Sequence, residues 1–274
     1  MRGNDVIGNP ESPSVATTLF ISDLHLDDAR PHIVHDFARF CADEAREADA
    51  LYVLGDVFEA YIGDDDDCAL NARVAAALHG VADAGVPVHY IAGNRDFLLG
   101  DDYARRCGMD ILEDGVVVDL YGTRTLLLHG DVLCTDDAAY LAFRRQVHDP
   151  AWQAAFLTRP VAERRAFAAR ARDASRAHTA TTDMAIMDVN QDAVAAALRG
   201  AGVARMIHGH THRPAIHDIT LDGKPARRIV LGDWYEQGSV LRVSSEAVEL
   251  HGLRVTVGPS IGHETRTPPG DFRG

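Results

Sequence analysis

Short apolar segments rich in β-branched residues recur along the chain and alternate with segments of helical periodicity. Eight segments have the length and composition of strands, at residues 18–22, 50–54, 86–91, 116–120, 125–128, 203–207, 228–231 and 239–243. Apolar spacing predicts helices over 31–48, 69–84 and 192–199, the last with Asn190 as its N-cap. This alternation predicts an α/β fold, and the strands late in the chain favour two packed sheets with helices outside.

Five of these strands run directly into side chains of the kinds that bind metal ions. The residues that follow them are Asp23 and His25, Gly55 and Asp56, Gly93 to Asp96, His129 to Asp131, and His208 to His212. Ligands bind at the carboxyl ends of strands in open α/β sheets, so we expect one shared site. A glycine in such a loop lets the backbone turn tightly and approach a ligand closely.

The residue types at these strand ends indicate the kind of ligand. Imidazole, carboxylate and an amide oxygen form a mixed nitrogen and oxygen set, which suits Mn, Fe, Zn or Co better than calcium. The candidates are Asp23, His25, Asp56, Asn94, His129, His210 and His212. Seven ligands are too many for one ion that must leave room for substrate. They suffice for two ions that share a carboxylate, the arrangement used for in-line displacement at phosphorus.

Each motif alone is a weak signal. An isolated Asp-x-His pair is usually a surface pair, and a Gly-Asp turn is common. With 14 histidines in 274 residues, His-x-His-x-His is expected only about 0.04 times by chance. Period-two spacing places His208 on the same side as His210 and His212 if the segment stays extended, so the role of His208 remains open.

Composition excludes several classes of protein. The chain has 27 basic and 41 acidic side chains, and a net charge of −14 argues against a nucleic-acid partner. A hydrophobic fraction of 46% is typical of a globular protein rather than a disordered one. No window approaches the ~18 apolar residues of a membrane-crossing helix, and the first residues do not form a secretory signal. The four cysteines are expected to be buried and reduced, as in a cytoplasmic protein.

Residues 136–189 interrupt the alternation of strands and helices. The segment from residue 140 to residue 178 contains eight arginines, three acidic residues and five aromatic residues. We interpret 136–189 as a helical cap inserted into a core of 17–135 and 190–254, with mobile ends at 1–16 and 255–274. The alternative is a solvated helical hairpin whose aromatic residues pack on the core. The acidic run at 64–67 is expected to be a solvated loop.

The ordered pattern D-x-H, G-D, G-N-x-D, H and G-H-x-H resembles the calcineurin-like binuclear metallophosphoesterases. Longer stretches at residues 20–26, 55–66, 92–97, 129–137, 186–191 and 207–214 are similar to the UDP-2,3-diacylglucosamine hydrolases of lipid A biosynthesis. The similarity spans about residues 18–243. Arg95 stands where the wider superfamily usually has histidine, as it does in this hydrolase family.

The resemblance implies a four-layer αββα sandwich with a helical cap and two Mn²⁺ ions per chain. The first ion would be held by Asp23, His25, Asp56 and His212. The second would be held by Asp56, Asn94, His129 and His210, so that Asp56 bridges the ions.

The resemblance also implies a reaction, hydrolysis of UDP-2,3-diacylglucosamine at its α-phosphorus to UMP and 2,3-diacylglucosamine 1-phosphate. The catalytic candidates are Asp56, Arg95 and His210, and no proton donor to the leaving group can be assigned. Candidate substrate contacts are Asn94, Arg95, Asp137, Ser175, Thr179, Thr182 and His210. Thr179 and Thr182 depart from the family pattern of Asn and Lys, and a hydroxyl does not replace an ammonium charge against phosphate.

An acylated UDP-sugar reaches its enzyme from a membrane surface. The basic, aromatic segment 140–178 therefore predicts peripheral association with the cytoplasmic face of the inner membrane, through anionic lipid. Two other functions remain as alternatives, a binuclear phosphodiesterase or phosphatase acting on a soluble nucleotide, and a non-catalytic interaction module that has lost its metals. The sequence does not indicate an oligomeric state.

Overall fold

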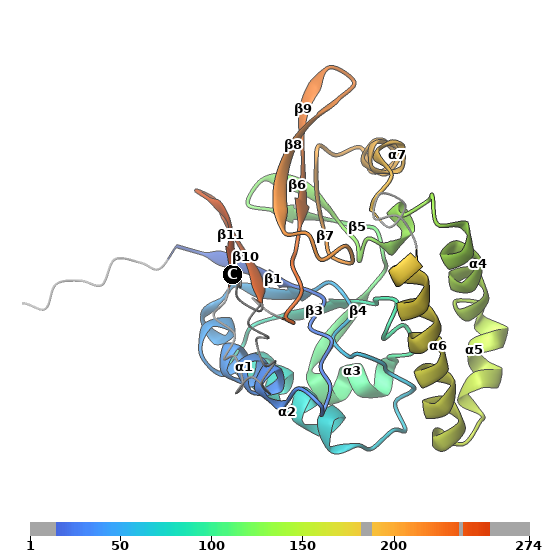
Figure 1. The fold of residues 1–274 in the computed structure, drawn as a ribbon. Coiled ribbons are helices and arrows are strands. Elements are labelled where there is room, and N and C mark those ends of the chain that lie inside the picture. Colours follow the sequence, from blue (N-terminus) through green and yellow to red (C-terminus); the bar gives the residue numbers. More distant parts are fainter. Residues whose placement is uncertain (1–14, 182–187, 236–237, 253–274) are drawn as a thin grey trace, which may run out of the picture.

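Two β-sheets face each other in the middle of the molecule (Figure 1). The computed structural model describes residues 15–181, 188–235 and 238–252. The six-stranded sheet has the order β11-β10-β1-β2-β3-β4. Its strands are β1 (Thr17–Ile21), β2 (Ala50–Val53), β3 (Val88–Ile91), β4 (Met109–Leu112), β10 (Ser239–Ser244) and β11 (Val248–Gly252). The four strands from β1 to β4 are parallel, so their carboxyl ends meet at one edge of the sheet.

The five-stranded sheet has the order β5-β6-β7-β9-β8. Its strands are β5 (Val116–Leu120), β6 (Thr123–Leu127), β7 (Arg205–His208), β8 (Ala215–Leu221) and β9 (Lys224–Val230). The central strands β6, β7 and β9 are parallel, and antiparallel β5 and β8 lie at the two edges. The loops after β6 and β7 therefore leave this sheet on the same side.

Helices cover the outer face of each sheet. Helices α1 (Pro31–Ala42), α2 (Ala69–Asp83) and α3 (Asp101–Cys107) pack on the six-stranded sheet, and α7 (Gln191–Ala201) packs on the five-stranded sheet (Figure 1). Short 3₁₀ helices lie at Glu44–Glu47 and Asp131–Leu133. Helices α4 (Ala138–Val147), α5 (Pro150–Leu157) and α6 (Val161–Thr181) stand beside both sheets.

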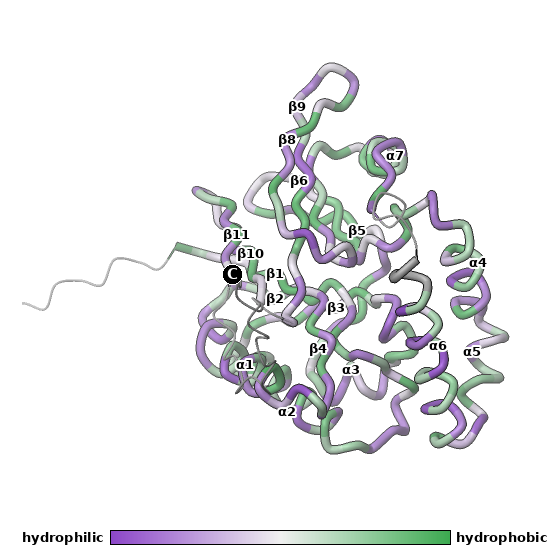
Figure 2. The backbone as a smooth tube through the Cα atoms, viewed as in Figure 1, coloured by the Kyte–Doolittle hydropathy of each residue, from purple (hydrophilic) through white to green (hydrophobic). Residues whose placement is uncertain are grey.

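The period-two alternation of strand residues produces three apolar cores. Leu19 and Ile21 pack toward α1 and α2, whereas Phe20 between them packs against the second sheet. In β7, Ile207 contributes to the core between the sheets and Met206 to the core under α7. Figure 2 shows apolar residues both in the strands of the two sheets and along the helices that cover them. The three cores separate four layers and confirm the predicted αββα sandwich.

The structure confirms most of the predicted elements and corrects some. All eight expected strands are present, and Asn190 caps α7 by accepting hydrogen bonds from the amides of Asp192 and Ala193. The sequence missed α3 and the strands β4, β8 and β11. The missed strands are short or interrupted by charged residues on an exposed edge. The helix expected over 31–48 ends at Ala42. Cys68 is only partly buried, unlike the other cysteines.

The acidic run at 64–67 is a loop with Asp65 and Asp67 exposed, as the sequence predicts, but Asp64 and Asp66 are partly buried and three of the carboxylates have specific partners. Asp64 accepts hydrogen bonds from the amides of Gly100 and Tyr103, at 2.9 and 3.0 Å, and so caps the start of α3. The neighbouring Asp65 and Asp66 form ion pairs with arginines of α6. These carboxylates therefore connect the core to α6. Within the described residues, no helix is long and apolar enough to cross a bilayer.

Candidate metal centre and substrate pocket

The loops that follow five strands place the expected ligands together. Strands of the first sheet lead into Asp23, His25, Asp56 and Asn94, and strands of the second sheet lead into His129, His210 and His212. Main-chain hydrogen bonds join these loops, because the amide of Asp23 donates to the carbonyl of Gly55 and the amide of Gly209 donates to that of His129. The site therefore lies where the carboxyl ends of both sheets converge.

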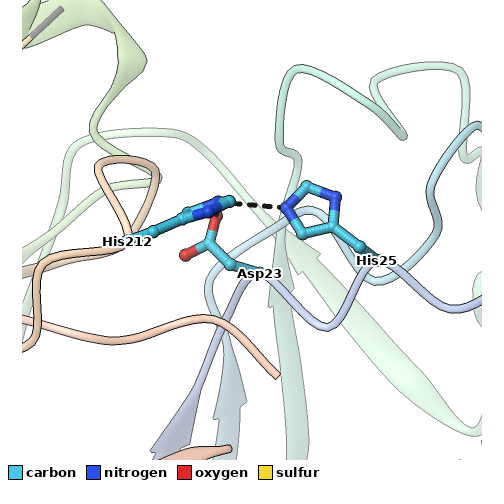
Figure 3. A group of neighbouring side chains, drawn as sticks. All are labelled: Asp23, His25 and His212. Carbon is cyan, nitrogen blue, oxygen red and sulfur yellow. Dashed lines mark hydrogen bonds and ion pairs between the residues drawn. The ribbon is translucent and has the colours of Figure 1, made fainter. Parts of the chain in front are cut away.

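One group of side chains consists of Asp23, His25 and His212, which point toward one another in Figure 3. The Nε2 atoms of His25 and His212 lie 3.1 Å apart, and Nε2 of His212 is 3.4 Å from Oδ1 of Asp23. Nδ1 of His25 is buried without a hydrogen-bond partner. Two imidazole nitrogens and a carboxylate oxygen at these distances form a donor set that fits a divalent cation.

A second group lies on the other side of Asp56. Oδ1 of Asn94 is 3.0 Å from Nε2 of His129 and 2.9 Å from Nδ1 of His210. The two carboxylate oxygens of Asp56 face different groups, since Oδ1 is 3.7 Å from Nε2 of His129 and Oδ2 is 3.9 Å from Nε2 of His25. Asp56 therefore lies between the two donor sets.

The backbone at this site is strained. Seven non-glycine residues in the described part of the chain have a positive φ, and five of them are candidate ligands. The five are Asp23, His25, Asp56, His210 and His212, with φ between 47° and 70°. Side chains disfavour this conformation, which costs of order 1–3 kcal/mol per residue and is concentrated at functional sites. The surrounding fold holds these five side chains in place at an energetic cost.

Two glycines allow the loops to approach the carboxylates. A Cβ atom on Gly93 would collide with the carboxylate of Asp56, and a Cβ atom on Gly209 would collide with Oδ2 of Asp23. The next amide after Gly209, that of His210, donates to both oxygens of Asp23 at 3.1 and 2.9 Å. Close contact at these two positions therefore explains the glycines in the G-N-x-D and G-H-x-H motifs.

Gly209→Ala is expected to lower affinity for divalent metal at least ~10-fold, because Asp23 must move away from His212. The overpacking is also expected to lower the free energy of unfolding by about 1–3 kcal/mol. Gly200→Ala in α7 is the matched control, since its Cβ meets nothing within 4 Å. That variant is expected to gain about 0.5–1 kcal/mol with unchanged metal affinity. Metal titration and urea unfolding measure both quantities, and equal metal affinities would contradict the role of Gly209.

Burial and neighbouring charges shift the pKa values of the candidate ligands. Burial raises the pKa of Asp56 to about 7 and lowers that of His210 to about 4. At His129, burial opposes protonation, but the carboxylates of Asp56 and Asp23 outweigh it and raise the pKa to about 9. A buried carboxylate with a raised pKa lacks compensating positive charge. A divalent cation would supply that charge and favour the ionised form of Asp56.

Several residues around the ligands had no role in the sequence analysis. Asp96, fully buried, accepts hydrogen bonds from the amides of Val57 and Gly93, at 2.6 and 2.8 Å, and so fixes the two loops to each other. Glu59 accepts a hydrogen bond from the hydroxyl of Tyr235 at 2.7 Å, and Oε2 of Glu59 lies 3.7 Å from Nδ1 of His25. Both acids lie within motifs of the sequence, but only the fold shows what they contact.

His208 does not join the other two histidines of its motif. Strand β7 ends at His208, and the backbone then turns, so the period-two placement fails. The imidazole of His208 is fully buried, with Nδ1 2.8 Å from the carbonyl oxygen of Gly209. His208 therefore contacts the backbone of the loop at Gly209 and is not grouped with the candidate ligands.

A mostly apolar pocket adjoins the metal centre, between the core and helices α4 to α6. Its volume is about 360 Å³, and Asn94 and Arg95 line it together with Ser175 from α6. Nη2 of Arg95 lies 3.5 Å from Oγ of Ser175, 80 positions along the chain. Asp137 instead occupies the N-cap of α4 and accepts a hydrogen bond from the amide of Tyr140. The side chains of Thr179 and Thr182 lie outside the described residues.

Two facing sheets that bring carboxylates, imidazoles and an amide oxygen together at their strand ends define a metal-dependent phosphoesterase. In agreement, the family model described as calcineurin-like phosphoesterase matches residues 16–214. A UDP-2,3-diacylglucosamine hydrolase of Xanthomonas oryzae pv. oryzae is 56% identical over 241 residues, which cover 85% of this chain and 98% of the relative. One of the same name from Escherichia coli is 52% identical over 233 residues, covering 85% of this chain and 97% of the relative.

The chain belongs to the calcineurin-like phosphoesterase family and, within it, to the family of UDP-2,3-diacylglucosamine hydrolases. It is therefore a metal-dependent hydrolase with a divalent metal ion as cofactor. This excludes the non-catalytic interaction module considered from the sequence.

Proposed function

We propose that this protein hydrolyses the pyrophosphate bond of UDP-2,3-diacylglucosamine at the α-phosphorus, which releases UMP and 2,3-diacylglucosamine 1-phosphate. The observation that carries the proposal is the joining of the candidate metal centre to an apolar pocket of about 360 Å³, with Asn94 and Arg95 at the junction. A substrate that has a pyrophosphate beside acyl chains requires this combination. The names of the relatives support the same substrate.

We further propose that two Mn²⁺ ions occupy the centre. Asp23, His25, Asp56 and His212 would hold one ion, and Asp56, Asn94, His129 and His210 would hold the other. The fit rests on the converging imidazole nitrogens, with Nε2 of His25 facing both His212 and Asp56, and on the two buried carboxylates. When bound, such ions supply positive charge that activates water and stabilises negative charge on the phosphoryl oxygens.

The chain's own residues orient the substrate. The amide of Arg95 donates to Oδ1 of Asp56 at 2.8 Å, so its guanidinium extends from the metal centre into the pocket. Nε of Arg95 is buried and unpartnered, and the group can offer parallel donors to phosphoryl oxygens. Ser175 holds this guanidinium from the side of α6. Tyr140 covers His210, with 5.9 Å between ring centroids.

The aromatic part of the pocket lining is suited to an acyl chain. Trp152 stacks on Phe156, and both contact Phe167, with ring centroids 4.8 to 5.7 Å apart. These rings line the pocket with other apolar side chains of α4 and the core. Burial of a methylene group in such a slot contributes about 0.8 kcal/mol, so long chains bind more tightly than short ones.

We propose that helices α4 to α6 also contact anionic lipid at the cytoplasmic face of the inner membrane. Phe143 of α4 and Leu157 of α5 are each 40% exposed. Two basic side chains of the same segment are also exposed, Arg159 between α5 and α6 and Arg165 on α6. Vesicles that contain about 30% anionic lipid mimic a charged membrane surface. When they are sedimented at low salt, the protein is expected in the pellet with them. Neutral vesicles are expected to leave it in the supernatant, and equal recovery with both would contradict an electrostatic contact.

The first test is release of UMP from UDP-2,3-diacylglucosamine, with bis-p-nitrophenyl phosphate as a small diester for comparison. Chelator is expected to abolish UMP release and Mn²⁺ to restore it, because the reaction needs the positive charge of a metal ion bound at the buried carboxylates. Cleavage of the small diester alone would retain the metal-dependent hydrolase and reject the acylated substrate. In that case a soluble nucleotide-type substrate would be the function.

A further inference from the structure

A second cavity lies beside the loop that carries His210 and His212. Those two histidines belong to the candidate metal centre. Thr211 and Arg213, which alternate with them along the loop, line this separate cavity of about 230 Å³. Residues of β8 and β9 complete its wall, among them His217 and Arg228. The cavity has no part in the proposed reaction.

Arg228 is the unusual residue of this cavity. Its side chain is buried, at 6% exposure, yet it forms no ion pair with any residue in the described part of the chain. Nη1 lies 3.3 Å from Nε2 of His208, and Nε has no partner. Arginines are almost never buried unless paired, because an uncompensated guanidinium in a protein interior is costly. Burial lowers the pKa of Arg228 accordingly.

A second polar group in the cavity wall also lacks a partner. Oγ1 of Thr211 is buried and forms no hydrogen bond. Of the other two charged residues in the wall, Arg213 forms an ion pair with Asp188, and the charge of Asp188 offsets only part of the effect of burial on Arg228. Arg228 is therefore a positively charged residue of the cavity wall that has no ion-pair partner among the described residues. This local positive charge contrasts with the net charge of −14 of the whole chain.

We propose that this cavity binds a small tetrahedral oxyanion of the phosphate class, held by the guanidinium of Arg228 and the hydroxyl of Thr211. A planar guanidinium offers two parallel donors to such an oxyanion, and a hydroxyl adds a third. The volume is ample for a phosphate group and a short substituent. The proposal stands independently of the substrate proposed for the metal centre.

Calorimetric titration of the metal-loaded protein with inorganic phosphate tests the proposal. Phosphate also binds divalent metal, so the result is read from differences between variants. Arg228→Met is expected to weaken the phosphate site that does not depend on the metal centre about tenfold or more, since a hydrogen bond to a charged group is lost. Asp188→Asn is expected to strengthen it about threefold, because one negative charge leaves the cavity wall.

Arg205→Met on β7 is the matched control. Arg205 is partly buried, donates a hydrogen bond to Oγ1 of Thr125 at 2.7 Å, and does not line the cavity. Its removal is expected to leave phosphate affinity unchanged. If Arg228→Met fails to fold, the opposite effect of Asp188→Asn still decides the question.

A parallel titration with glycerol 3-phosphate separates free phosphate from a phosphomonoester as the occupant. An Arg228-dependent site for either ligand supports the proposal, and the tighter ligand identifies the source. Identical isotherms for the wild type, Arg228→Met and Asp188→Asn with both ligands would overturn it.

Discussion

Asp56→Asn is expected to lower kcat/KM for UDP-2,3-diacylglucosamine at least ~10³-fold, equivalent to about 4 kcal/mol of transition-state stabilisation. Each oxygen of Asp56 faces a different donor group, toward His25 on one side and His129 on the other. Asparagine preserves the size of the side chain but removes the negative charge that both groups share. In the proposed two-ion arrangement, the change would therefore weaken both metal positions at once. Steady-state kinetics at saturating Mn²⁺ measure the loss.

Asn94→Ala is the matched comparison for Asp56→Asn. Asn94 contacts only the second group, through His129 and His210, so its removal is expected to cause a smaller loss. The free energy of unfolding of both variants is measured in urea, to separate a catalytic loss from a folding defect. Losses below tenfold in both variants would mean that Asp56 does not bridge two ions.

The sequence was sufficient to predict the layers of the fold and the residues that meet at the strand ends. In both cases the information is local, because period-two alternation and the residue that follows a strand can be recognised without knowing the fold. The prediction placed Asp23, Asn94 and His129 together from different strands, and the structure brings them together. The sequence leaves the role of His208 open, and the structure decides it, because a turn of the backbone replaces the extended segment that would have placed it beside His210 and His212.

The contacts between the core and helices α4 to α6 could not be predicted from the sequence. Arg95 meets Ser175 across 80 positions, and Arg164 reaches the carbonyl of Ile62 across 102 positions. Nothing local distinguishes Arg164 from the exposed Arg165 beside it. Burial of one and exposure of the other depend on how α6 packs, which is a property of the tertiary structure.

Arg164→Met is expected to lower the free energy of unfolding by about 2–4 kcal/mol. Arg164 is 1% exposed and donates from Nη1 to the carbonyl of Ile62 at 2.6 Å and from Nε to that of Arg159 at 3.0 Å. Nη2 of the same guanidinium pairs with Asp65. Methionine fills the space but leaves two carbonyl oxygens without donors. Urea unfolding monitored by circular dichroism measures the change.

Arg165→Met is the control on the next residue of the same helix. Its partner is Asp66 at 2.8 Å, but the arginine side chain is 60% exposed, and such pairs contribute about 0–1 kcal/mol. Helix α6 also contributes Ser175 and other residues to the pocket lining. Because loss of Arg164 loosens the packing of α6 on the core, Arg164→Met is expected to raise KM for the acylated substrate. Arg165→Met is expected to leave KM unchanged. Equal stabilities for the two variants would show that α6 is held by its apolar face alone, without the buried guanidinium.

The hydrogen bond from Arg164 also predicts a pH dependence, because it lowers the pKa of Asp65. A carboxyl group whose pKa is lowered on folding stabilises the protein above its unfolded pKa of about 4 and loses that contribution as the pH falls through the folded value. The stability difference between the wild type and Arg164→Met is therefore expected to be constant near neutral pH and to narrow below about pH 4. The part that survives in acid comes from the two carbonyl contacts, which do not titrate. A difference that vanished completely in acid would assign the whole effect to the ion pair with Asp65.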